Sequence, residues 1–265
     1  MFGEQRTEFL GLDASEEDEF PFVVKRIDAG ADLSVQVHPG AEAAARMCGA
    51  RTGKAEAWVI LDAAPGAVVY LGFEPGVDAG QIAAAAREGD VSRLLRAVPV
   101  AAGDVIPVPP GCVHAIGGGI VLFEAQEPLD MTFRLDDWGR PHAGDASPRE
   151  LHVAEALAVL DPELRPEKAA PATVLRGAGI VVRELCALGP FRIERWDVKG
   201  RVTRTINRLH VLQCMSGEVI LRTIGGERIE MARGDTVVVA ARSSRIYLEA
   251  ARAELLVVAP RRDGS

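Results

Sequence analysis

Short apolar runs punctuated by Gly and Pro fill most of the chain from Phe20 onward, and this pattern constrains the fold more than any other feature. The segments FPFVVKRIDA, LSVQVHP, AEAWVILDA and AVVYLGFEPG are typical of strands bounded by turns. The same pattern resumes later in IVVRELCAL, HVLQCMSGEVILRT and DTVVVAA. The sequence therefore predicts a mainly β protein.

Two segments carry helical spacing instead. The Ala-rich stretch GQIAAAAREGDVSRLLRAV indicates a small helical insertion over about residues 77–98. The stretch SPRELHVAEALAVLD predicts a helix over 147–161, because Ser147, Pro148 and Glu150 would stand at the N-cap, N1 and N3 positions of a capping box. A Pro- and Ala-rich connection at 161–177 separates two halves of the chain.

A faint internal repeat relates the two halves. GDVIPVPPGCVHA begins at Gly103 and GDTVVVAARSSRI begins at Gly234, and when the glycines are aligned His114 falls opposite Arg245. Two copies of one β unit favour a pair of jelly-roll barrels. We expect the barrels to cover residues 1–165 and 166–265, and the second to be a degenerate copy without a metal site.

Composition and charge argue against several classes of protein. The net charge of −8 disfavours a nucleic-acid-binding surface, although a local cluster of Lys and Arg would still admit an anionic substrate. The four widely spaced cysteines favour buried thiols in a reducing cytosol. The acidic N-terminus and the lack of a run of about 18 apolar residues indicate neither export nor membrane spanning. We therefore expect a cytoplasmic protein without nucleic-acid or membrane partners.

Side chains able to hold a metal recur in three separate segments. In LSVQVHPG, strand alternation puts Gln36 and His38 on one face, which either contacts water or lines a cavity. Glu56 opens the next strand. His114 ends a segment of the form G-x5-P-x-G-x-x-H, which is similar to the second signature of the cupin family. Together these four residues would form a mixed nitrogen and oxygen set suited to Zn²⁺ or a neighbouring divalent ion.

Several motifs in a fixed order carry a more specific resemblance. LSVQVHP, GKAEAWVIL, VPPGCVHAIGGGI and TFRLDDWGR, followed by RELHVAEAL, resemble the type I mannose-6-phosphate isomerases in their short bacterial form. The resemblance covers about residues 20–165 and extends only loosely to the C-terminal half. It implies two cupin barrels with a helical insert and one zinc ion per chain. The implied zinc ligands are Gln36, His38, Glu56 and His114, so the polar face of LSVQVHPG would point inward.

The resemblance also implies an activity, the interconversion of mannose 6-phosphate and fructose 6-phosphate through a cis-enediol. Moving a proton between C1 and C2 needs a base, for which Glu124 is a candidate. The metal and Arg134 would stabilise the negative charge that develops on the enediolate oxygens. Lys54, two residues before Glu56, would meet the substrate phosphate or a sugar oxygen. The expected partner is a small sugar phosphate, bound by a monomer or a homodimer.

Two alternatives stay open. An Fe(II) cupin dioxygenase or a hydrolase could use a similar ligand set, although Lys54 and Arg134 suit a phosphorylated polyol better. The other alternative is a non-catalytic sugar-phosphate sensor. Family members usually begin with a further segment that contains a Trp-Gly-Gly strand and a Gly-Glu-Ser-Trp stretch, whereas here about twenty residues precede FPFVVKRIDA. We expect the loss of those strands to weaken closure of the first barrel, which keeps the sensor in consideration.

Overall fold

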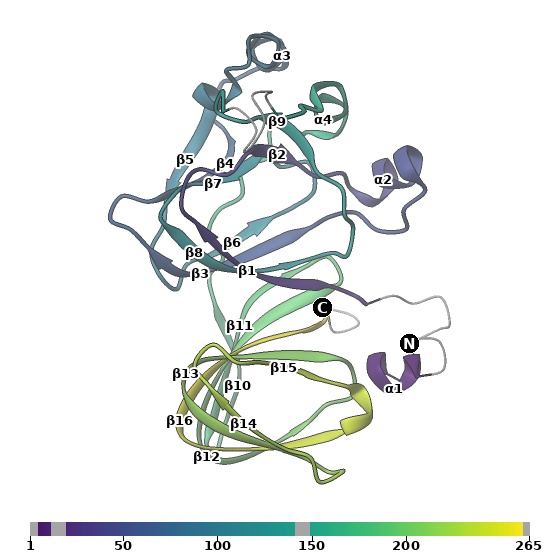
Figure 1. Cartoon of the computed structure of the whole chain (residues 1–265), viewed down its shortest axis with the longest axis vertical. Helices are drawn as coiled ribbons and strands as arrows, with labels where there is room; N and C mark the ends of the chain where they lie inside the picture. The colour runs from purple at the N-terminus through teal and green to yellow at the C-terminus, as the bar shows by residue number, and fades with distance from the viewer. Residues whose placement is uncertain (1–4, 12–19, 141–148, 262–265) are drawn as a thin grey trace. The chain divides into compact units, whose positions relative to one another are not determined.

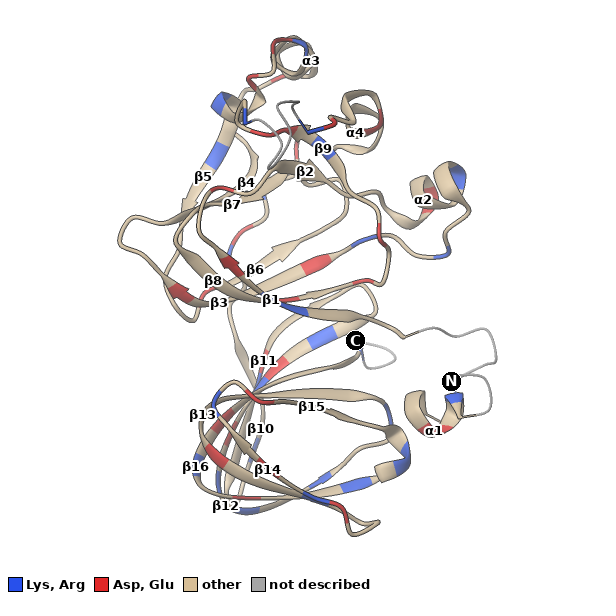
Figure 2. Ribbon diagram, viewed as in Figure 1, with Lys and Arg blue, Asp and Glu red and all other residues tan. Residues whose placement is uncertain are grey.

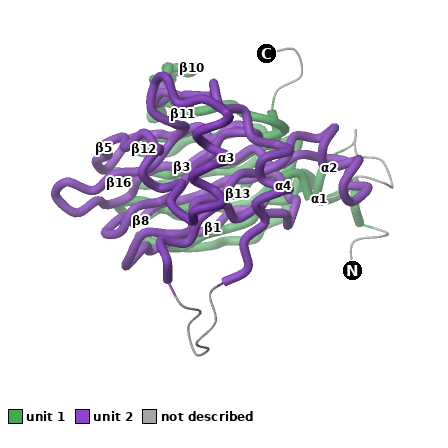
Figure 3. Tube along the Cα trace, turned by 90° about the horizontal axis from the view of Figure 1, so that it is seen from above, with its two compact units in different colours: residues 1–22, 170–265 green, residues 23–169 purple. Residues whose placement is uncertain are grey.

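A computed structural model describes residues 5–11, 20–140 and 149–261 of the 265-residue chain. The chain divides into two compact units, the N-terminal unit of residues 23–169 and the C-terminal unit of residues 170–265 together with 1–22 (Figure 3). The sequence-based division set the boundary at 165 and grouped the first residues with the first barrel. Helix α1 (Arg6–Leu10) instead contacts the C-terminal unit, where Glu8 pairs with Arg242 at 2.9 Å.

Two antiparallel sheets build the N-terminal unit (Figure 1). One has the strand order β1-β8-β3-β6 and the other β5-β4-β7-β2-β9. Buried apolar side chains from both sheets, among them Trp58, Leu71 and Leu122, form a shared core. The strands are β1 (Val23–Ala29), β2 (Val35–Val37), β3 (Glu56–Ala63), β4 (Val68–Phe73), β5 (Leu95–Pro99), β6 (Val105–Val108), β7 (His114–Ile116), β8 (Ile120–Gln126) and β9 (Phe133–Asp136).

Long, bent strands build the C-terminal unit. The pairing of β12 with β16 shifts register between Val198 and Gly200, and that of β13 with β16 shifts between Cys214 and Ser216. Such bulges bend a strand and increase its twist, so the sheet curls around a core that contains Trp196. The strands are β10 (Ala172–Gly177), β11 (Ile180–Leu188), β12 (Phe191–Thr205), β13 (His210–Thr223), β14 (Arg228–Ala232), β15 (Thr236–Val239) and β16 (Arg245–Pro260).

One bulge requires glycine. Gly217 in β13 has a φ of +76°, and a Cβ at this position would overlap the carbonyl oxygen of Arg252 in the neighbouring β16. A left-handed backbone conformation and this close approach together exclude any side chain. The bend of β13 therefore depends on one residue type at one position.

These sheets confirm the predicted fold of two β jelly-roll units, and the helical insertion is confirmed in part. Helix α3 (Ala79–Glu88) begins at a capping box of Asp78 and Gln81, and the 3-10 helix η1 (Val91–Leu94) follows it. The remainder of the predicted helical segment, from Leu95, is strand β5, which pairs with β4. The helix prediction was wrong there because strand pairing outweighs local helical spacing.

The predicted helix over 147–161 is shorter than expected. Ser147 and Pro148 lie outside the described residues, and helix α4 covers only Val153–Val159. Glu150 is not at an N3 position, because the helix has His152 as its N-cap and begins at Val153. The Glu150 carbonyl accepts a hydrogen bond from Arg134 Nη1 at 2.7 Å. His152 also donates its amide to the Arg134 carbonyl at 2.8 Å. These contacts with β9 hold the segment extended, so the helix begins only after them.

The remaining helical elements of the described ranges are α2 (Ala41–Cys48) and η2 (Ala241–Ser243). Within those ranges no helix is both long enough and apolar enough to cross a membrane.

The internal repeat forms the same turn in both units. Gly103 and Gly234 have φ values of +94° and +98°. In each copy the following aspartate accepts a hydrogen bond at 2.8 Å from the amide three residues before it. The next strand is β6 in one unit and β15 in the other, after which His114 opens β7 and Arg245 opens β16. The alignment of His114 with Arg245 therefore reflects equivalent places in the two units.

Charged side chains of both signs are interspersed along the strands (Figure 2). In the C-terminal unit Glu249 illustrates their local pairing, since it contacts Arg201 at 3.1 Å and Arg222 at 3.3 Å. Exposed pairs of this kind add little to stability because water screens them. The stability of each unit therefore comes mainly from its apolar core.

Candidate metal centre

Three side chains from separate strands of the N-terminal unit meet at one buried point. His38 follows β2, Glu56 opens β3 and His114 opens β7. Their exposed fractions are 1%, 2% and 1%, and one potential ligand atom from each lies within 4.8 Å of the others. Within the described ranges this is the one group of His, Cys, Asp or Glu with metal-ligand spacing. The structure thus brings three of the four predicted ligands together.

Main-chain carbonyls fix the orientation of both imidazoles. His38 Nδ1 lies 3.1 Å from the Met131 carbonyl, and His114 Nδ1 lies 2.9 Å from the Cys112 carbonyl. A carbonyl oxygen can only accept, so in each ring Nδ1 carries the hydrogen and Nε2 keeps its lone pair. Both Nε2 lone pairs are then available to a metal, as in histidine sites whose outer nitrogen is held by a carbonyl.

Two atoms at the centre of the group lack hydrogen-bond partners among the described residues. His38 Nε2 lies 3.0 Å from Glu56 Oε1, and His114 Nε2 lies 3.8 Å from Glu56 Oε2. His38 Nε2 and Glu56 Oε2 are buried and have no hydrogen-bond partner in the described part of the chain. Buried lone pairs that face one another need a cation among them. Two imidazoles and a carboxylate form a donor set that suits zinc or iron.

The protonation states of the group also suit a metal. Burial raises the pKa of Glu56, but His38, His114 and Lys54 outweigh burial and hold that pKa well below its usual range. Burial and the neighbouring His38 lower the pKa of His114 to about 4. At neutral pH the carboxylate is therefore ionised and the His114 imidazole neutral, which are the forms that bind metals.

Gln36 reaches the same group from the middle of β2. It lies directly opposite His114 in the β2–β7 pair and opposite Arg134 in the β2–β9 pair, so the three side chains share one face of the sheet. Its Nε2 lies 3.2 Å from His114 Nε2. Since the oxygen and nitrogen of an amide occupy nearly equivalent positions, turning the amide presents Oε1 instead. Gln36 can therefore supply an oxygen ligand without any movement of the backbone.

Lys54 lies beside the ligand carboxylate. Its side chain is 7% exposed, and Nζ lies 3.2 Å from Glu56 Oε1. Nζ also donates to Thr132 Oγ1 at 3.1 Å. The predicted proximity of Lys54 to Glu56 thus corresponds to a direct ion pair, and a positive charge is held at the edge of the group.

Glu124 lies in β8, opposite Trp58 in the β3–β8 pair. Its Oε2 accepts a hydrogen bond from Trp58 Nε1 at 2.9 Å, and its Oε1 lies 3.0 Å from Lys25 Nζ. Burial and the nearby Glu56 carboxylate raise the pKa of Glu124. The Trp58 ring also lies 5.6 Å from the His114 ring. One indole therefore contacts both the Glu124 carboxylate and the ring of His114.

Arg134 lies on the sheet face of Gln36, and its guanidinium is held by the chain that follows β9. Its Nη1 donates to the Glu150 carbonyl at 2.7 Å, while its buried Nε has no partner among the described residues. Burial and the positive charge of Arg149 lower the pKa of Arg134. The guanidinium thus has donors left over for an anion.

Sequence reasoning missed three groups that contact these residues, namely the Lys25 ammonium, the Thr132 hydroxyl and the Met131 carbonyl. The contact of Lys25 depends on the register of β1 against β8, and the other two depend on the path of the chain into β9. The alternation of side chains within one strand predicts neither the register between strands nor the path of the chain between them. A lysine within the apolar run FVVKRI was the signal that would have identified Lys25.

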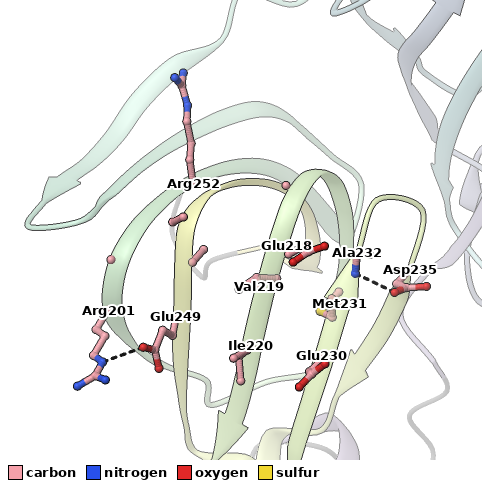
Figure 4. Close-up of a pocket in the computed structure, with 14 residues that line it drawn as sticks. Arg201, Glu218, Val219, Ile220, Glu230, Met231, Ala232, Asp235, Glu249 and Arg252 are labelled. Carbon is pink, nitrogen blue, oxygen red and sulfur yellow. Dashed lines mark hydrogen bonds and ion pairs between the residues drawn. The ribbon is translucent and has the colours of Figure 1, made fainter.

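The C-terminal unit carries a groove of about 1150 Å³ between its bulged strands (Figure 4). Its acidic side chains are partly engaged already, since Glu249 pairs with Arg201 at 3.1 Å and Asp235 accepts from the Ala232 amide at 2.8 Å. The residues that line the groove, all within the described ranges, include neither His nor Cys. The nitrogen donors of a metal site therefore occur in the N-terminal unit and not in this groove.

Comparison with curated proteins shows similarity to mannose-6-phosphate isomerases. The chain is 39% identical over 187 residues to the mannose-6-phosphate isomerase ManA of Bacillus subtilis, a match that covers 70% of this chain and 58% of the relative. It is 33% identical over 221 residues to the mannose-6-phosphate isomerase of Streptococcus mutans, which covers 83% of this chain and 68% of that protein. The chain thus spans about three fifths of the length of the first relative. No family model matches the chain.

Comparison with solved structures also finds mannose-6-phosphate isomerases. The crystal structure of a mannose 6-phosphate isomerase from Bacillus subtilis superposes with a TM-score of 0.85 and 25% identity, covering 97% of this chain and 80% of that one. A putative mannosephosphate isomerase from Archaeoglobus fulgidus superposes with a TM-score of 0.74 over 98% of this chain and 79% of that one, and at 23% identity it supports the fold alone.

Proposed function

The chain belongs to the mannose-6-phosphate isomerase family, and on that premise we propose that it interconverts mannose 6-phosphate and fructose 6-phosphate. The observation that carries the proposal is the buried group of His38, Glu56 and His114 with the Lys54 ammonium beside it. A metal site with an adjacent fixed cation suits a polyol that bears an anionic group. The four free cysteines fit a reducing compartment, and the proposed place of action is the cytoplasm.

The proposed cofactor is one zinc ion, held by His38, Glu56 and His114 with Gln36 as the oxygen ligand. Two imidazoles, an ionised carboxylate and an amide oxygen fit zinc and leave room for substrate. When bound, the ion would supply Lewis acidity toward a carbonyl or hydroxyl oxygen of the sugar. The carbonyls of Met131 and Cys112 support this assignment because they hold both Nε2 atoms toward the same point.

Glu124 is the proposed base. Isomerisation removes the proton from C2 of the aldose, forms a cis-enediol and returns a proton to C1, while a second proton moves between O1 and O2. A carboxylate with a raised pKa is suited to accept and return a proton near neutral pH. Lys25 and Trp58 hold the two carboxylate oxygens, so the orientation of the base is fixed before substrate binds.

The two remaining cations have separate proposed roles. Arg134, whose Nε has no hydrogen-bond partner among the described residues, would bind oxygens on which negative charge develops. Lys54 would donate to a sugar or phosphate oxygen from a fixed point beside Glu56. The partner is accordingly a small sugar phosphate.

A second candidate function rests on the ligand set itself. Two histidines and one carboxylate are also the set used by non-haem Fe(II) oxygenases. Lys54 argues against this assignment, because a buried ammonium at 3.2 Å from the ligand carboxylate serves an anionic substrate better than molecular oxygen.

One purification with three readouts tests the proposal. Elemental analysis gives the metal, a coupled assay gives turnover of mannose 6-phosphate before and after chelation, and re-addition of zinc or iron identifies the active ion. We expect about one zinc per chain and turnover that chelation abolishes and zinc restores. Bound zinc without turnover would indicate a sensor of sugar phosphates instead. Iron with oxygen consumption would support the oxygenase.

A further inference from the structure

We infer that Thr132 is a positioning residue that holds the Lys54 ammonium at the candidate metal centre. The inference deepens the proposed function and rests on it only for the effect on turnover. Thr132 Oγ1 accepts a hydrogen bond from Lys54 Nζ at 3.1 Å, and Thr132 lies on the segment that enters β9, 78 residues along the chain from Lys54. The residue before it, Met131, supplies the carbonyl that orients His38. Two adjacent residues of one segment thus hold two groups of the site.

Lysine needs such support more than any other residue of the site. Its four-carbon stem is flexible and its ammonium is a point charge with three equivalent donors, so one contact does not fix its position. Nζ has two contacts with described residues, Glu56 at 3.2 Å and Thr132 at 3.1 Å. The two together direct the remaining N–H, which is the donor available to a substrate oxygen.

The two contacts are not equivalent. The Glu56 carboxylate is shared, because His38 Nε2 lies 3.0 Å from the same Oε1 and His114 lies on the other oxygen. A carboxylate that also serves as a metal ligand has less negative charge to offer the ammonium, and a nearby divalent ion repels the ammonium. The Thr132 hydroxyl is a neutral acceptor, and the branched Cβ of threonine restricts χ1, so this contact persists whether or not Glu56 is engaged.

The experiment compares full-length variants purified in parallel. Thr132→Val keeps the shape but removes the acceptor, Thr132→Ser keeps the acceptor, and Thr203→Val, at an exposed position of the C-terminal unit, is the matched control. Thr132→Ala provides a second loss of the hydroxyl if the valine variant folds poorly. The chain has four lysines, so partial acetylation followed by peptide mass spectrometry gives a rate for each, with Lys25, Lys168 and Lys199 as internal references.

We expect acetylation of Lys54 to be about tenfold faster in Thr132→Val than in the wild type, the size that follows from losing one hydrogen bond to a charged group. Thr132→Ser and Thr203→Val should stay within about twofold of the wild type, since neither loses that hydrogen bond. The kcat/KM should fall in Thr132→Val and stay near that of the wild type in Thr132→Ser and Thr203→Val, with metal content unchanged in all of them. Equal Lys54 rates in the wild type, Thr132→Val and Thr132→Ala would overturn the inference whatever the turnover. The expected labelling pattern in a protein without turnover would support the positioning role and refute the proposed function.

Discussion

Replacing His210 should change how the stability of the C-terminal unit depends on pH. His210 is 5% exposed, its Nδ1 donates to the Arg208 carbonyl at 2.8 Å, and its ring lies 6.3 Å from that of Trp196. Burial, together with the positive charges of Arg192 and Arg204, lowers its pKa from 6.5 to about 4. His210→Gln keeps an amide donor for the carbonyl but does not titrate.

The sign and size of the effect follow from linkage. Between pH 6.5 and about 4 the unfolded chain binds a proton at His210 and the folded chain does not, so the free energy of unfolding falls as the pH falls through this window. At about 1.4 kcal/mol per pH unit, the gap between the two pKa values amounts to about 3 kcal/mol. Above pH 6.5 this contribution is fully present, and below about pH 4 it is lost.

Guanidinium denaturation of the wild type and His210→Gln at several pH values between 8 and 4 measures the effect. Subtracting the free energies of unfolding of the two proteins at each pH cancels the contributions of groups that titrate in both. The wild type should lose about 3 kcal/mol more than the variant over this range. Titration of the five imidazoles by NMR provides the direct check. The same pH dependence in both proteins, or a pKa near 6.5 for His210, would refute the reasoning.

His114→Ala removes a ligand of the buried group, so elemental analysis should find a metal content near zero and the coupled assay should find no turnover. A variant that keeps both the metal and the turnover would contradict the assignment of His114 as a ligand. Arg134→Ala should retain the metal while kcat falls by about tenfold or more, and an unchanged kcat/KM would exclude a role for the guanidinium. Gly217→Ala should lower the free energy of unfolding by about 1–3 kcal/mol, because the added Cβ would sit on a backbone with a positive φ and close to the carbonyl of Arg252. Thermal unfolding measures this loss. Gly226→Ala is its control, since Gly226 has a φ of +93° but nothing within 4 Å of the added Cβ.

Much of the architecture could be predicted because it depends on local sequence patterns. The alternating runs give the strands, and the glycines of the repeat mark equivalent turns at 103 and 234. The residues His38, Glu56 and His114 were singled out from three segments, and the structure brings them within 4.8 Å. Side chains alternate along a strand, so the sequence of each segment alone determines the face on which its side chains lie.

The rest depends on contacts between segments distant in sequence. The stretch from Leu95 has helical spacing but pairs with β4, and the segment before α4 is held extended by β9. Lys25 and Thr132 acquire their place from inter-strand register and chain path. A hydrogen bond between residues 78 positions apart leaves no periodic trace, so pattern reasoning cannot find it.

The carbonyls that orient His38 and His114 belong to the main chain, at Met131 and Cys112. Every amino acid supplies a carbonyl, so substitution at either position can leave the imidazoles correctly turned as long as the backbone keeps its path. We therefore expect the side chains at these two positions to change without turning the imidazoles, as long as the backbone keeps its path. Substitution of Met131 or Cys112 should therefore be tolerated better than substitution of His38 or His114, because the first two act through their main chain and the last two through their side chains.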